Sequence, residues 1–140
     1  GSVSDKSYFQ KLQALLIEYK LEHKVQFLVN VEAKKKNEIL QNSDIAIFPT
    51  QYESYGMAIQ ECLNMDLPCL DSDFDNLKNQ FGNKGIRYLS LEAKLWSEAI
   101  SNLLAENNSY STLIEEIKNQ KTTFNSWAQQ AKKIQNFISK

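Results

Sequence analysis

Two glutamates and a glycine lie close together in the stretch from Phe48 to Glu61. Glu53 comes just before Gly56, and Glu61 follows in a run of helix-favouring residues. If a helix begins near the glycine, Glu53 lies just before it and Glu61 about five residues inside it, so at ~1.5 Å per residue the two are separated by about 8 Å along the axis. Free N–H groups at the start of a helix bind anions such as a diphosphate, and carboxylates accept strong hydrogen bonds from hydroxyl groups.

These residue types therefore predict a site for a sugar linked through a diphosphate to a nucleotide. Glu53 would accept hydrogen bonds from the sugar hydroxyls and Glu61 from the ribose hydroxyls. The backbone amides of Tyr55, Gly56 and Met57 would hold the diphosphate. Two glutamates at this spacing are also typical of solvated helix charges, so both interpretations stay open. The predicted ligand-binding residues are Glu53, Ser54, Tyr55, Gly56, Met57 and Glu61.

The elements around this stretch would place it at the edge of a sheet. Ile45 to Phe48 is a continuous apolar run stopped by Pro49, which is typical of a strand buried on both faces of a parallel sheet. Residues 55–65 gather apolar side chains on one side, which predicts a helix. Because open α/β sheets bind ligands at the carboxyl ends of their strands, both glutamates would lie where such a sheet binds its ligand.

The other elements alternate in the same way. Periodicity predicts helices over about 5–20 and 33–41, strands at 25–29, 68–70 and 86–89, and a polar loop leading into a short helix over 71–80. Three apolar stripes after the last strand predict a helical C-terminal segment. The order predicts an α/β fold, a Rossmann-like, doubly wound parallel sheet of about four strands.

The composition disfavours several classes of function. Sixteen basic and seventeen acidic residues give a net charge of -1, so we expect no nucleic-acid partner. Cys62, Cys69 and His23 are too few for a disulfide framework or a zinc site, which favours a reducing, cytoplasmic setting. No apolar run approaches the ~20 residues of a membrane-spanning helix. Residues 1–2, Gly-Ser, look like the remnant of a cleaved expression tag, which leaves 3–140 as one domain.

The same stretch also resembles a known family. The residues that carry the likeness are an apolar strand with Phe48-Pro49-Thr50, then Glu53, Tyr55-Gly56 and Glu61. Together they resemble the C-terminal donor-binding domain of the family-four retaining glycosyltransferases, the glycosyl transferases group 1, which have the GT-B fold. The likeness covers most of the chain. Further segments that resemble the family are Val25 to Val31, Asn42-Ser43-Asp44, Leu67-Pro68-Cys69 and Phe124-Asn125-Ser126-Trp127.

The resemblance implies that residues 3–140 are part of a C-terminal nucleotide-sugar-binding domain, one half of a GT-B architecture. Glu53 would be the catalytic residue that contacts the transferred sugar, and Glu61 would bind the ribose. Val29, Asn30 and Val31 would lie near the base. The donor would be a nucleotide-diphosphate sugar of the UDP or GDP type, with no cofactor and no metal.

The family also implies partners beyond the donor. The acceptor would be a glycan, with bacterial surface polysaccharide as the expected class, bound by an N-terminal domain that this chain lacks. Peripheral membrane association of the full-length enzyme stays open. As a whole, the chain is expected to act within a full-length glycosyltransferase.

The chain departs from the family pattern in two places. The run Asp71-Ser72-Asp73-Phe74-Asp75 stands where the family has Gly-Gly, and Val29 replaces another glycine. Three acidic residues facing a diphosphate would repel it. The family domain normally also begins with a strand–helix–strand unit whose Arg and Lys neutralise the diphosphate. We therefore expect weak donor binding and no turnover by the chain alone, and the alternative function is an interaction module that kept the fold but lost sugar transfer.

Overall fold

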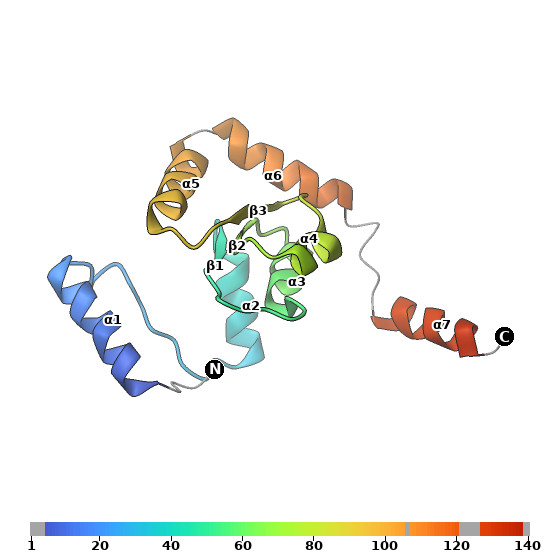
Figure 1. Cartoon of the computed structure of the whole chain (residues 1–140), viewed down its shortest axis with the longest axis horizontal. Coiled ribbons are helices and arrows are strands. Elements are labelled where there is room, and N and C mark those ends of the chain that lie inside the picture. Colours follow the sequence, from blue (N-terminus) through green and yellow to red (C-terminus); the bar gives the residue numbers. More distant parts are fainter. Residues whose placement is uncertain (1–4, 106, 121–126, 139–140) are drawn as a thin grey trace. The chain divides into compact units, whose positions relative to one another are not determined.

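The computed structural model describes residues 5–105, 107–120 and 127–138. The chain divides into two compact units, Gly1–Ile39 and Leu40–Lys140. Figure 1 follows the order of the elements along the chain. Within the described residues there are seven helices and three strands: α1 Lys6–Glu18, α2 Ala33–Gln41, β1 Ala46–Phe48, α3 Met57–Asn64, β2 Cys69–Ser72, α4 Asp75–Phe81, β3 Ile86–Leu89, α5 Ala93–Ala105, α6 Asn107–Gln120 and α7 Trp127–Ile138.

The first unit begins with α1, as the sequence predicts. The side chain of Asp5 caps this helix by accepting a hydrogen bond of 2.9 Å from the N–H of Tyr8. The rings of Phe9 and Phe27 pack edge to face with their centres 4.7 Å apart. In this unit, an aromatic contact therefore ties the capped helix α1 to the segment that follows it.

The strand predicted at 25–29 is wrong, because those residues adopt no regular secondary structure. Val25, Leu28 and Val29 are each more than two-fifths exposed. A strand is stable only where a neighbouring strand completes its hydrogen bonds, and none of the described strands pairs with this segment. β-branched and aromatic composition alone cannot replace that partner.

The second unit is built on a parallel sheet of three strands in the order β1-β2-β3, one strand fewer than predicted. Phe48, Asp71 and Tyr88 are neighbours in register across it and so lie on one face. Ile47, Leu70 and Arg87 form the adjacent row, which lies on the opposite face. The predicted strands at 45–48 and 86–89 are confirmed to within one residue.

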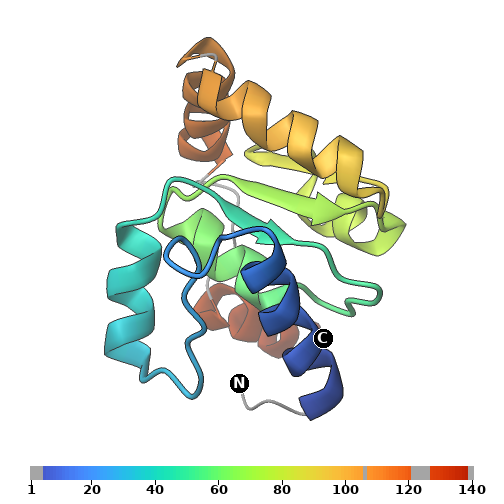
Figure 2. The same ribbon diagram turned by 90° about the vertical axis from the view of Figure 1, so that its left-hand side faces the viewer.

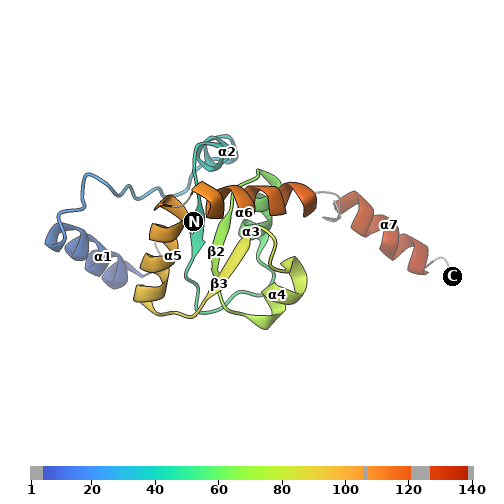
Figure 3. The same ribbon diagram turned by 90° about the horizontal axis from the view of Figure 1, so that it is seen from above.

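Helices cover both faces of this sheet. Figure 2 shows the strands between α5 on one side and α3 on the other, and Figure 3 shows α5 and α6 together on the near side. A hydrophobic core lies mainly between the sheet and the helices α3 and α4. Its buried members include Ile59, Leu63, Leu77, Phe81, Cys69 and Ile86. An α/β sheet wound on both faces is compatible with a Rossmann-like fragment.

The predicted polar loop at 71–80 is wrong at its beginning. Asp71 and Ser72 belong to β2 and are almost completely buried, and α4 follows from Asp75. Polar residues are tolerated in a buried strand when they are hydrogen-bonded. Ser72 meets this condition, since its Oγ donates to the carbonyl of Phe48 at 3.3 Å and its N–H donates to Oδ1 of Asp71 at 2.7 Å.

The helical C-terminal segment is present, with α5, α6 and α7 where the three stripes predict them. Residues 124–126 of the Phe-Asn-Ser-Trp motif lie outside the described residues. Across the described part of the chain, none of the helices has the length and apolar character that crossing a bilayer requires.

Candidate functional site

The loop between β1 and α3 carries most of the predicted site. β1 ends at Phe48 and α3 begins at Met57, so residues 49–56 form the connection. Since the three strands are parallel, this loop lies at the same edge of the sheet as the ends of β2 and β3. The predicted residues are therefore at the carboxyl edge, where open α/β sheets bind their ligands.

Glu53 is fixed at the amino end of α3. Its Oε1 accepts two backbone hydrogen bonds, from the N–H of Gly56 at 2.9 Å and from the N–H of Tyr55 at 3.1 Å. These two bonds lower the pKa of Glu53 from its ordinary value, against the opposing effect of partial burial. The carboxylate is thus held ionised, in one orientation, beside the positive end of a helix.

This geometry changes what the amides can do. The N–H groups of Tyr55 and Gly56, predicted to hold a diphosphate, donate their hydrogen bonds to Glu53 instead. A phosphate would have to displace the carboxylate to use them. The N–H groups of the first helical turn, from Met57 onward, have no acceptor within a helix and point in the same direction. They are the better-placed donors for an anion.

Gly56 has a structural role that does not depend on any ligand. Its φ of 68° lies in the left-handed region. A Cβ at this position would stand 2.8 Å from the ring of Phe81 and 2.9 Å from Cδ1 of Ile59. The chain can enter α3 this close to the core only with a glycine.

Asn76 in α4 is a site residue that the sequence did not reveal. Its Nδ2 donates to the carbonyl oxygens of Glu53 at 2.9 Å and Ser54 at 3.2 Å. These bonds tie the loop to the next helix and help to fix Glu53. Only the packing of α3 beside α4 brings Asn76 to the loop, so no sequence spacing could have identified it.

Glu61 lies further along the same helix, four residues after Met57, and so on the same face of α3. Its side chain is partly buried, and Met57 is well exposed. The buried face of the helix carries Ile59, Cys62 and Leu63 instead. The structure thus brings Glu53, Met57 and Glu61 together on one loop and helix. Val29, Asn30 and Val31 belong to the first unit, and their role with the base stays a prediction.

Asp71 occupies the carboxyl end of the central strand and is fully buried. Its Oδ1 accepts from the N–H of Ser72, and its Oδ2 is buried with no hydrogen-bond partner in the structure. Burial raises the pKa of Asp71 to about 6, the Ser72 N–H opposes this, and the negative charge of Glu53 adds to it. Two carboxyl groups with pKa values displaced in opposite directions therefore lie at one edge of the sheet.

The expectation that three acidic residues face a ligand from one loop is not met. Asp71 lies inside β2, and Asp73 forms an ion pair with Lys78. Asp75 is in the first turn of α4, where the helix dipole stabilises a carboxylate. Each acid has a different environment, because a strand end, an ion pair and a helix start follow one another within five residues.

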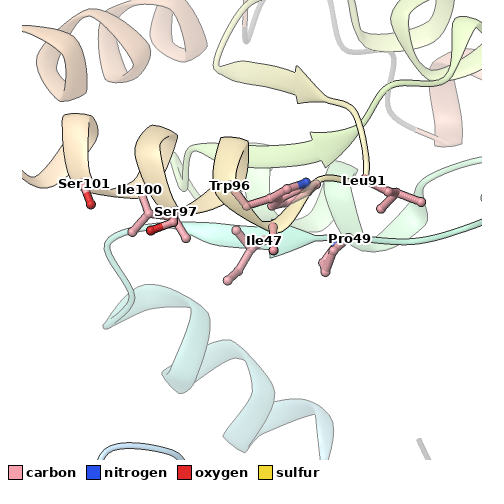
Figure 4. Close-up of a pocket in the computed structure, with 8 residues that line it drawn as sticks. Ile47, Pro49, Leu91, Trp96, Ser97, Ile100 and Ser101 are labelled. Atoms are coloured by element: carbon pink, nitrogen blue, oxygen red, sulfur yellow. The ribbon is translucent and has the colours of Figure 1, made fainter. Parts of the chain in front are cut away.

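A cavity of about 580 Å³ lies between β1 and α5. Figure 4 shows Ile47, Pro49 and Leu91 beside the ring of Trp96, whose Nε1 donates to the carbonyl of Ser90 at 2.9 Å. Ser97 and Ser101 are its polar lining residues. An apolar groove of this kind offers no charged group to a phosphate. Within the described residues, no three His, Cys, Asp or Glu side chains are grouped so that they could hold a metal ion.

Comparison with known protein families places the chain in a family. The sequence model of the family described as glycosyl transferases group 1 matches residues 1–120. The matched range contains every predicted site residue, from Val29 to Glu61. A search of curated proteins found no significant match.

Proposed function

Because the chain belongs to the glycosyl transferases group 1 family, we propose that its loop before α3 and the helix itself bind the nucleotide-diphosphate-sugar donor of a retaining glycosyl transfer. Group 1 membership suggests glycosyl transfer in general. The donor role of this particular stretch is supported by one observation above all. Glu53 is held ionised at the amino end of a helix that also carries the partly buried Glu61, one turn after the exposed Met57.

Each residue has a separate role in the proposed complex. The donor phosphates lie against the first turn of α3, where the N–H groups from Met57 onward and the helix dipole attract anions. Oε1 of Glu53 keeps its two backbone bonds, which leaves Oε2 to accept hydrogen bonds from hydroxyls of the transferred sugar. Glu61 accepts from the ribose hydroxyls of a UDP- or GDP-type donor. Asn76 holds the loop in position from α4.

Glu53 is the proposed catalytic residue because it contacts the sugar whose bond is broken. Its rigid attachment means that the carboxylate needs no reorientation as positive charge develops on the sugar ring during transfer. The proposal places this chain in the C-terminal half of a GT-B enzyme, with the acceptor glycan bound elsewhere. No metal and no cofactor are included in it.

Nucleotide titration followed by NMR tests the proposal. UDP and GDP are added to the ¹⁵N-labelled chain up to millimolar concentration, and we expect amide shifts centred on residues 53–61. Glu61→Ala should weaken binding about tenfold or more, since a hydrogen bond to a charged group contributes about 1.5–3 kcal/mol. Glu98→Ala is the matched control, because Glu98 is an exposed glutamate on α5, near Lys94.

The outcome that contradicts donor binding is equally clear. If neither nucleotide shifts residues 53–61, or if Glu61→Ala and Glu98→Ala respond like the unchanged chain, the site does not bind the donor through these side chains.

The second candidate function is an interaction module without sugar transfer. The apolar groove beside β1 favours it, because Ile47 and Leu91 are 48% and 51% exposed there and exposed apolar clusters often mark contact surfaces. This function predicts no nucleotide response at all. The same titration therefore separates the two candidates.

A further inference from the structure

We propose that Asp71 is a positioning residue of the donor site, which takes up one proton when the donor binds and so leaves Glu53 as the ionised carboxylate of the pair. This inference rests on the proposed donor role of Glu53. It assigns a function to a buried side chain that lies in the run of acidic residues where the family has glycines.

The first argument is the unsatisfied oxygen of Asp71. The residue has no exposed surface, its Oδ1 is hydrogen-bonded to the N–H of Ser72, and its Oδ2 is buried without a partner. A buried carboxylate oxygen without a hydrogen bond is costly when ionised, whereas a protonated oxygen carries no charge to desolvate. Thr50, two residues after the neighbouring strand β1 ends, also has a buried hydroxyl without a hydrogen-bond partner. Two buried polar atoms without a hydrogen-bond partner, Oδ2 of Asp71 and Oγ1 of Thr50, therefore lie near this edge of the sheet.

The second argument is the set of groups that act on Asp71. Glu53 faces it from the loop before α3, Tyr88 from β3, and Cys69 from its own strand. Tyr88 and Cys69 stay neutral near pH 7, because burial raises the pKa of Tyr88, and a hydrogen bond with Cys62 together with burial raises that of Cys69. Glu53 is thus the charged group among these three, and its charge is negative.

From the two helices on this face, other titratable groups contribute less. Lys78 of α4 is paired with Asp73, and its Nζ lies 6.0 Å from the ring centre of Tyr88. Cys62 of α3 is buried and interacts with Cys69, on the same strand as Asp71. Lys78 is therefore already engaged by Asp73, and no cation is among the described groups that shift the pKa of Asp71.

A donor diphosphate adds two negative charges close to Glu53 and Asp71. Glu53 cannot take up a proton readily, because its backbone bonds favour the ionised form. Asp71, with a pKa of about 6, can take up a proton near neutral pH. The proton comes from solvent and bonds to Oδ2, no other bond forms or breaks, and the donor is unchanged. Binding and protonation are then linked, so each favours the other.

The expected effect follows from the fraction of neutral Asp71. If the donor binds the form in which Asp71 is neutral, its apparent Kd increases as that fraction falls. With a pKa of about 6, the Kd should rise about tenfold between pH 5 and pH 7 and a further tenfold by pH 8. The probes are UDP-glucose and GDP-mannose, because their diphosphate is doubly esterified and does not titrate over this range. UDP and GDP are unsuitable here, because their terminal phosphate does titrate over this range.

The experiment measures the Kd of both probes by NMR from pH 5 to pH 8 for the unchanged chain and for Asp71→Asn. We expect Asp71→Asn to bind with the affinity that the unchanged chain has at pH 5, and with no dependence on pH. Asp73→Asn is the matched control, since Asp73 is two residues away, partly exposed and paired with Lys78. His23→Gln removes the one histidine of the chain. Both should keep the full pH dependence.

A second measurement needs no variant. The ¹³C shift of the Asp71 carboxyl, followed against pH, should show its pKa rising when the chain is saturated with donor. A Kd that does not change with pH, a slope that persists in Asp71→Asn, or an Asp71 pKa that saturation does not raise would each refute proton uptake while donor binding stands. Absence of probe binding at every pH would refute both proposals together.

Discussion

Replacing Asp71 with asparagine should stabilise the ligand-free chain at neutral pH. The pKa of Asp71 is raised from 3.8 to about 6 in the folded chain. Because the folded state binds the proton more tightly than the unfolded state, stability from this group is complete below pH 3.8 and is lost as pH rises through 6. At about 1.4 kcal/mol per pH unit, the interval corresponds to about 3 kcal/mol.

Asparagine keeps the shape of the neutral acid and its acceptor for Ser72, so it removes only this cost. We expect Asp71→Asn to raise the free energy of unfolding by about 3 kcal/mol at pH 7.5, by about half of that near pH 5, and by nearly nothing below pH 4. Urea unfolding followed by circular dichroism at each pH measures the difference in the free energy of unfolding between Asp71→Asn and the unchanged chain. The pH effects of other carboxylates cancel in this difference, because both proteins contain them. Asp73→Asn should show no such gain.

One result would refute this reasoning. If Asp71→Asn lowers stability by the same amount at pH 4 and at pH 7.5, the carboxyl is not costly to ionise in the folded chain. Asp71 would then be an ordinary acceptor whose second oxygen finds a partner in solution.

Three further substitutions test the geometry of the site. Gly56→Ala should lower the free energy of unfolding by about 2–4 kcal/mol in urea, since it combines a left-handed backbone with a Cβ overlapping the core. Asn76→Ala should cost about 1 kcal/mol of stability and weaken UDP-glucose binding several-fold, because Glu53 and its loop lose their attachment to α4. Glu116→Gln should destabilise the chain at pH 7 but not at low pH. Burial alone would raise the Glu116 pKa, but Arg87 and a backbone N–H lower it, so its contribution disappears as pH falls through that pKa.

The buried part of the fold was predictable because its residues carry strong local signals. The apolar run before Pro49 and the alternation of strands and helices after it predicted the parallel sheet and the helices on its two faces. The segment at 25–29 has the composition of a strand but none of the described strands as a partner, and composition does not report pairing. The strand prediction failed at 25–29 because a strand depends on pairing with a partner that is distant in sequence, which local composition does not reveal.

The strand and helix around the candidate site were predictable, but the hydrogen bonds within it were not. Glu53 and Glu61 lie where the spacing placed them, on either side of the start of a helix. The hydrogen bonds from Tyr55 and Gly56 to Glu53, and those from Asn76 to the loop, depend on a backbone conformation and on helix packing. Residue types and spacing contain neither kind of information. They predict that the amides of Tyr55 and Gly56 hold a phosphate, whereas in the structure these amides donate to Glu53. A phosphate could bind to them only by displacing that carboxylate.

The acidic run at 71–75 argued against donor binding when taken as sequence, because three negative charges near a diphosphate would repel it. In the structure these charges do not act together. Asp73 is neutralised by Lys78, and Asp75 is stabilised by the first turn of α4, so neither needs a cation from elsewhere. Asp71 remains, and burial raises its pKa to about 6, so a proton can neutralise it near physiological pH. Of the three acidic residues expected to repel a diphosphate, only Asp71 therefore remains to be explained. Its charge depends on pH and, in our proposal, on the binding of an anionic ligand.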